Sequence, residues 1–126
     1  MNSSPAVSEG FSRDDRLRKR REFEECYASG VRVSGRHVQV FVLLADSSTR
    51  PRLGISVPRR LGSAVARNRV RRRLREIFRR GRGLFDGGAL TIVVNARPSA
   101  AQASFQELAE DFAESVRRAR SRLPRP

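Results

Sequence analysis

Apolar positions recur along the chain at two spacings, and these spacings separate the expected helices from the expected strands. Residues 13–29 follow the helical spacing of three and four, and Gly30 suits the left-handed turn that ends many helices. The apolar positions of this first helix are Leu17, Phe23, Cys26 and Tyr27. We therefore expect a helix that ends at Gly30.

Three other segments have the pattern of strands. Residues 31–45 alternate with period two, which puts Val38, Val40, Val42 and Leu44 on one face and Gln39, Phe41 and Leu43 on the other. Residues 52–57 form a second alternating run, which Pro58 keeps from continuing as a central strand. Residues 90–94 are nearly all apolar, as in a short strand buried on both faces.

Two further helices are expected. Gly62-Ser63 begins a helix that runs to about Arg80, and a glycine-rich loop follows it. Ser104 and Glu107 form a capping box at the start of the last helix, which Pro124 stops. The apolar face of that last helix consists of Phe105, Leu108, Phe112 and Val116. The order of helix, strands, helix, strand and helix predicts a compact α+β fold, an α/β sandwich.

The chain has 126 residues, which fits one domain. We assign residues 13–123 to that domain, residues 1–12 to a disordered lead-in rich in Ser, Gly and Pro, and residues 124–126 to a tail. Cys26 is the sole cysteine, no apolar run is long enough to span a bilayer, and the N-terminus lacks the blocks of a secretion signal. These features predict a soluble cytoplasmic protein.

The central helix has two contrasting sides. Placed at 100° per residue, its apolar residues gather on one side, which is expected to pack on the sheet. This apolar stripe is Ala66, Val70, Leu74, Ile77 and Phe78. Residues 67–82 also contain nine arginines and a single acid, Glu76. The opposite side carries Asn68, Arg72, Arg75 and Arg79, flanked by Arg69 and Arg71.

The net charge of the chain and the spacing of its arginines indicate what this helix binds. The net charge is +14, and Lys19 is the only lysine among 27 basic residues. Like charges four residues apart destabilise a helix, and Arg67, Arg71 and Arg75 repeat this spacing. An external polyanion relieves such repulsion, and arginine forks match phosphates. We therefore expect this helix to bind nucleic acid, and Asn68 to contact a base or a 2′-OH, or to be simply an exposed polar residue.

Independent catalysis and DNA binding fit the chain less well. A nuclease would need clustered acids or a histidine pair, but His37 is the single histidine and Glu22, Glu24 and Glu25 form no metal motif. A DNA-reading helix would be expected in a helix-turn-helix or a dimer, and neither pattern is present.

Three segments resemble the protein component of bacterial ribonuclease P: RLRKRREFEECYASGVRVSGRHVQVFVL, GISVPRRLGSAVARNRVRRRLREIFR and ARPSAAQASFQEL. The likeness runs from about Leu17 to Leu123, and its most specific part is the Arg67-Asn68-Arg69 helix after a strand that ends in a Ser-Val turn and a basic pair. Arg73 departs from the pattern, because many relatives carry an aliphatic residue there.

The resemblance implies a partner and a fold. It implies that an RNA subunit holds most of the Mg²⁺ and cleaves the phosphodiester. No metal site on the protein itself is evident from the sequence. The protein would bind ribonuclease P RNA and the single-stranded 5′ leader of precursor tRNA, with no membrane partner and no evident protein oligomer. It also implies a mixed four-stranded sheet of the ribosomal protein S5 domain 2-like type, with a left-handed crossover around residues 58–90. The alternative is a ribosomal-type or chaperone RNA-binding protein without a role in tRNA processing.

The resemblance also assigns residues. Those implied to bind RNA are Arg67, Asn68, Arg69, Arg71, Arg72, Arg75, Arg59 and Arg60. Those implied to line a central cleft for the leader are Phe23, Tyr27 and Phe41, with Ser34 at a weaker match. Flat rings there would stack unpaired bases. The sequence pattern by itself favours Phe23 and Tyr27 as ordinary core residues, and it is the resemblance that favours the cleft.

Overall fold

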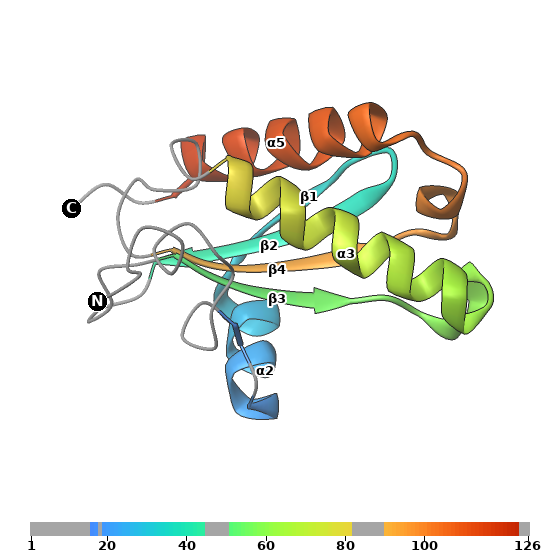
Figure 1. The fold of residues 1–126 in the computed structure, drawn as a ribbon. Coiled ribbons are helices and arrows are strands. Elements are labelled where there is room, and N and C mark those ends of the chain that lie inside the picture. The colour runs from blue at the N-terminus through green and yellow to red at the C-terminus, as the bar shows by residue number, and fades with distance from the viewer. Residues whose placement is uncertain (1–15, 18, 45–50, 82–89, 124–126) are drawn as a thin grey trace, which may run out of the picture.

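The fold was analysed in a computed structural model, which describes residues 16–17, 19–44, 51–81 and 90–123. The expected α+β fold is confirmed (Figure 1). The helices are α2 (Arg20–Ser29), α3 (Ala64–Arg80) and α5 (Phe105–Ser121), with short 3-10 helices η2 (Arg59–Leu61) and η3 (Pro98–Ala101). The strands are β1 (Val31–Ser34), β2 (Val38–Leu44), β3 (Arg52–Ser56) and β4 (Leu90–Ala96). The lead-in 1–12 and the tail 124–126 lie outside the described residues.

The four strands form one mixed sheet in the order β1-β2-β4-β3. β2 pairs antiparallel with both β1 and β4, whereas β3 pairs parallel with β4. In Figure 1, β3 and β4 both run from left to right, β4 lies above β3, and α3 crosses on the viewer's side. This arrangement makes the β3-α3-β4 connection left-handed, against the general preference for the right hand.

Helices cover the two faces of the sheet unequally. α3 and α5 pack on one face over the main core, whose largest fully buried side chains include Phe78, Phe112, Leu53 and Ile92. α2 packs on the other face over a small cluster of Leu17, Cys26, Phe41 and Val93. Because this second cluster is small, part of that face of the sheet stays open.

The alternating run of residues 31–45 is a hairpin rather than one continuous strand. Val31 to Ser34 pair with Val42 to Gln39, so the chain reverses at residues 35–37. The carboxylate of Asp111 in α5 stabilises this turn by accepting the backbone N–H groups of Arg36, His37 and Val38 at 2.7–3.0 Å. A carboxylate 73 or more residues away in the sequence therefore fixes the turn, and the strand pattern carried no sign of it.

The first helix is shorter than expected. It begins at Arg20, whereas Arg16 and Leu17 lie beside β3, where the Leu17 amide donates to the Leu53 carbonyl at 3.0 Å. Gly30 is also not left-handed, since its φ is −78°. Glycine is needed there for space: a Cβ would lie 2.6 Å from the Cys26 carbonyl oxygen.

The expected starts of the other helices are confirmed. The Ser63 hydroxyl accepts from the Ala66 amide at 3.1 Å, and Ser104 and Glu107 form both hydrogen bonds of the capping box. The Ser104 amide lowers the pKa of the Glu107 carboxyl, and this favours the charged cap. Along α5, Leu108, Phe112 and Val116 are buried as expected, whereas Phe105 is only half-buried.

Candidate nucleic-acid interface

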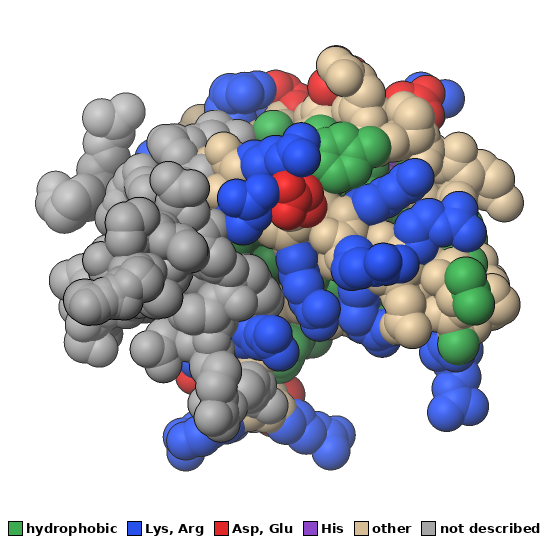
Figure 2. Space-filling model, in the orientation of Figure 1, with side chains coloured by type: hydrophobic (Ala, Val, Ile, Leu, Met, Phe, Trp, Pro, Cys, Tyr) green, Lys and Arg blue, Asp and Glu red, His purple; other side chains and the backbone are tan. Residues whose placement is uncertain are grey.

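The apolar stripe of α3 anchors the helix to the core. Val70, Leu74, Ile77 and Phe78 are buried, and Ala66 packs partly against the same cluster. The polar side of the helix is therefore turned away from the sheet, and Figure 2 shows Lys and Arg side chains covering much of that face. The predicted amphipathic helix is confirmed.

The polar side of α3 divides into exposed and half-buried residues. Asn68, Arg69 and Arg72 are exposed, whereas Arg67, Arg71 and Arg75 are half-buried. We call these six residues the arginine face. Arg71 donates to the Asn68 amide oxygen at 3.2 Å, which ties the two side chains together.

Like charges crowd one flank of the arginine face. Burial lowers the pKa of Arg75, and the nearby guanidinium groups of Arg16 and Arg71 lower it further. The Nε atom of Arg67 is buried without a hydrogen-bond partner in the described part of the chain. An anion bound along this flank would reduce the repulsion.

The positive charge of the last turn of α3 is partly offset within the protein. Glu76 accepts from Arg79 at 2.5 Å and from Arg80 at 2.6 Å. The hydrogen bond from Arg79 is the main cause that lowers the pKa of Glu76 from 4.5 to about 2. The carboxylate therefore stays ionised near neutral pH, and most of the excess positive charge lies on the earlier turns of the helix.

The aromatic positions lie on the opposite face of the sheet. Tyr27 of α2 is 38% exposed, and its ring packs edge-on against Phe41 with 4.8 Å between the ring centroids. The Tyr27 hydroxyl donates to the Asn95 amide oxygen at 2.9 Å. Phe41 is buried, so Tyr27 offers the accessible ring of this pair.

Phe23 lies apart from Tyr27, at the β3 edge of the same face. Its ring packs over Gly54, where a Cβ would lie 2.7 Å from two ring carbons. Phe23 is half-buried and lines a hollow of about 210 Å³ with Arg71 and Arg75. Phe23 therefore packs partly against the small cluster under α2 and partly lines this hollow.

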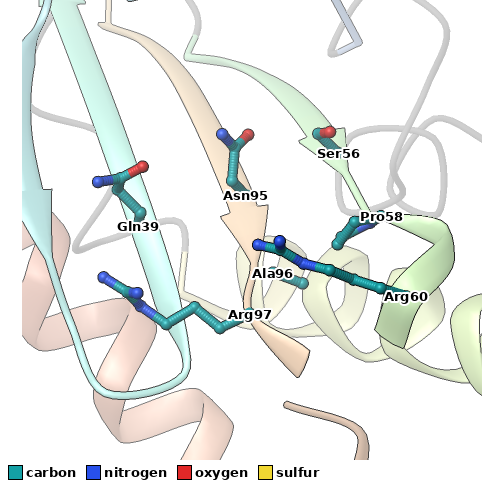
Figure 3. A pocket seen from close by; sticks show the side chains of 7 residues that line it. All are labelled: Gln39, Ser56, Pro58, Arg60, Asn95, Ala96 and Arg97. Atoms are coloured by element: carbon teal, nitrogen blue, oxygen red, sulfur yellow. The ribbon is translucent and has the colours of Figure 1, made fainter. Parts of the chain in front are cut away.

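A polar groove of about 210 Å³ opens on the uncovered end of the sheet (Figure 3). We call it the sheet groove; its lining residues are Gln39, Ser56, Pro58, Arg60, Asn95, Ala96 and Arg97. Figure 3 shows Gln39, Asn95 and Ser56 rising side by side from neighbouring strands. Amide and hydroxyl groups there can both donate and accept hydrogen bonds, which suits the edges of unpaired bases.

Most residues of the sheet groove were not identified as candidate site residues from the sequence. Strand alternation already placed Gln39 on the face opposite the main core, and Asn95 shares that face because the two residues are register partners. Arg97 lines the groove with its side chain held by a hydrogen bond to the Gly35 carbonyl at 3.1 Å. This contact depends on the hairpin.

The remaining candidate residues are Arg59, Arg60 and Ser34. Arg59 and Arg60 are both exposed on η2, and Arg60 lines the sheet groove rather than the arginine face. The Ser34 hydroxyl accepts from the Gln39 amide at 3.1 Å, so Ser34 supports a groove residue.

His37 and Cys26 have structural surroundings. His37 is buried, with Nδ1 at 2.9 Å from the Ser99 hydroxyl. Burial raises the pKa of the Cys26 thiol to about 11, so the thiol is protonated at neutral pH.

Within the described ranges, no three His, Cys, Asp or Glu residues lie close enough together to hold a metal ion. None of the described helices is long and apolar enough to cross a bilayer.

Comparisons with known proteins point to one family. The family described as Ribonuclease P matches residues 11–120. The ribonuclease P protein component of Acidothermus cellulolyticus is 42% identical over 77% of this chain and 81% of its own length. That of Shouchella clausii is 31% identical over 90% of this chain and 93% of its own.

Solved structures agree with the sequence relatives. A mutant of the Staphylococcus aureus RNase P protein superposes with a TM-score of 0.81 at 27% identity, covering 95% of this chain and 98% of that one. The RNase P protein of Thermotoga maritima gives 0.73 at 31% identity, covering 82% and 96%. The alternative of a ribosomal or chaperone protein finds no support in these comparisons. This chain belongs to the ribonuclease P protein family.

Proposed function

We propose that the chain binds the RNA subunit of ribonuclease P through its arginine face and the 5′ leader of precursor tRNA through the opposite face of the sheet. In this proposal it assists the endonucleolytic removal of the leader, which yields the mature 5′ end of tRNA. The RNA subunit performs the cleavage with Mg²⁺, and the complex works in the cytoplasm, where precursor tRNA is made.

The arginine face supports the contact with the RNA subunit. Arg69 and Arg72 are exposed and have no hydrogen-bond or ion-pair partner in the described part of the protein. Each arginine that neutralises a phosphate releases counterions, so binding through this face must weaken steeply as salt rises. The anchored apolar stripe holds these side chains in place before RNA arrives, which reduces the entropy lost on binding.

The sheet face supports the contact with a single strand. Tyr27 presents an accessible ring beside the sheet groove, and its hydroxyl fixes Asn95, one of the groove residues. A ring can stack an unpaired base of any kind, while Arg60 and Arg97 supply positive charge for its backbone. A precursor tRNA carries such unpaired bases in its leader.

The described side chains support a non-catalytic role for the protein. The ring of His37 is buried beside Ser99, and the thiol of Cys26 is buried between α2 and the sheet. Neither group lies in the sheet groove or on the arginine face. The proposal therefore assigns the chemical step to the RNA and positioning to the protein.

The observation that carries this proposal is one small domain with an arginine face on one side of its sheet and an aromatic, amide-lined groove on the other. Its test is reconstitution. Purified chain is added to a bacterial ribonuclease P RNA at low Mg²⁺, and cleavage of 5′-labelled precursor tRNA is followed. We expect the chain to restore cleavage at the mature 5′ end under these conditions. Binding to the RNA without restored cleavage would instead favour a ribosomal or chaperone role.

A further inference from the structure

A second groove lies between α3 and the first turn of α5. Its volume is about 430 Å³, and we call it the α3–α5 groove. Its lining residues are Arg69, Arg72, Arg73, Glu76 and Phe105. It opens on the helical side of the molecule, across the sheet from the sheet groove, and Figure 2 shows basic, acidic and apolar patches close together on that side.

The contacts inside this groove leave it strongly basic. Glu76, its one acidic residue, already accepts from Arg79 and Arg80 and is ionised at neutral pH with both partners held close. Arg73 donates to the Ala103 carbonyl at 3.0 Å, which places its guanidinium at the base of α5. Three arginines therefore face a groove whose single carboxylate is already neutralised.

Phe105 gives the groove an apolar wall. Its ring is half-buried against the main core, and the Arg80 guanidinium lies 5.5 Å from its centroid. A flat ring beside fixed cations fits a ribose next to its phosphates, because the sugar has apolar C–H faces and the phosphates need charge.

We infer that the α3–α5 groove binds a sugar–phosphate segment of ribonuclease P RNA, with Arg73 and Phe105 as contacts that the arginine face alone does not include. This inference rests on the proposed function and adds a second contact region to it. Charge complementarity argues for RNA as the occupant, since the groove presents cations to a polyanion. Its position across the sheet from Tyr27 separates this segment from the one proposed for the leader.

The test uses single replacements in the full chain. Arg73→Gln removes one charge from the groove, and Phe105→Leu keeps an apolar side chain but removes the flat ring. Arg118→Gln is a matched control at an exposed arginine of α5 outside the groove. Circular dichroism and thermal melting check that each variant folds. Affinity for ribonuclease P RNA is then measured across a range of salt concentrations, together with the affinity ratio of the holoenzyme for leader-bearing and mature tRNA.

We expect Arg73→Gln and Phe105→Leu each to weaken binding to ribonuclease P RNA by roughly five- to tenfold, and Arg73→Gln to lower the salt slope by about 0.7–0.9. Phe105→Leu should leave the slope unchanged, Arg118→Gln should bind like the original chain, and the leader ratio should stay constant in all. If the groove variants match Arg118→Gln while the original chain binds the RNA, this inference is wrong and the proposed function survives. If the original chain does not bind, the proposed function itself fails.

Discussion

Replacing Arg67, Asn68 and Arg69 together by alanine should weaken binding to ribonuclease P RNA by about a hundredfold or more, since hydrogen bonds to charged groups contribute about 1.5–3 kcal/mol each. The salt slope should fall by about 1.4–1.8, the amount expected for two lost phosphate contacts. The helix itself should remain, because its buried stripe is untouched and alanine has the highest helix propensity. Binding is measured by filter retention at several salt concentrations.

The matched control for this triple variant removes the same charge elsewhere. Arg118 and Arg122 are exposed at the end of α5, away from both grooves, and replacing both by alanine should leave the slope almost unchanged. Should the triple variant keep the original slope, α3 is not the surface that meets the RNA phosphates. Equal losses in the triple variant and the control would show a general effect of net charge.

Tyr27→Ala should lower the affinity of the holoenzyme for leader-bearing precursor tRNA while leaving mature tRNA nearly unaffected. Stacking of a base on an aromatic ring contributes about 1–3 kcal/mol, so the ratio of the two affinities should fall by roughly five- to a hundredfold. The exposed ring is expected to meet a base directly, and its loss also releases Asn95 at the edge of the sheet groove. Equilibrium binding of both tRNA forms gives the ratio.

Tyr27→Phe separates the ring from its hydroxyl. It keeps the ring against Phe41 and loses only the hydrogen bond to Asn95, so we expect most of the leader preference to remain. Equal losses for leader-bearing and mature tRNA in Tyr27→Ala, or loss of folding, would support a core role for this ring. Phe23 is a poorer test, because its ring packs over Gly54 and its removal would leave a cavity.

The amphipathic helix could be predicted because its information is local. The apolar stripe repeats every three to four residues, and the Ser63 cap lies one residue before Ala64, so both follow from neighbouring positions. The capping box of α5 is equally local, with both hydrogen bonds between Ser104 and Glu107. Such elements need no knowledge of the rest of the fold.

The features that were missed depend on distant partners. The hairpin turn is stabilised by Asp111, and Leu17 lies beside β3 because its amide donates to the Leu53 carbonyl. A local pattern records neither contact. The left-handed crossover was expected only from the resemblance, since the general rule favours the opposite hand.

The sequence pointed to many of the candidate residues, but it did not show on which face of the sheet each of them lies. The sequence placed Arg59 and Arg60 together with α3, whereas Arg60 lines the sheet groove on the other side. The resemblance grouped the aromatic positions in one cleft, and the structure places the exposed Tyr27 ring against the buried Phe41, with Phe23 farther along over Gly54. The register of β2 against β1 and β4 decides which strand residues face the groove. This register depends on pairing between distant segments, so the pattern of a single segment does not contain it.

Photo-crosslinking from the two faces tests most directly whether this domain holds two RNAs on opposite sides of its sheet. Benzoylphenylalanine is placed at Arg72 on the arginine face or at Gln39 in the sheet groove, and each protein is assembled with ribonuclease P RNA and labelled precursor tRNA. We predict crosslinks from position 72 to ribonuclease P RNA and from position 39 to the tRNA leader. Crosslinks from both positions to the same RNA, or from position 39 to no leader nucleotide, would contradict the two-sided arrangement.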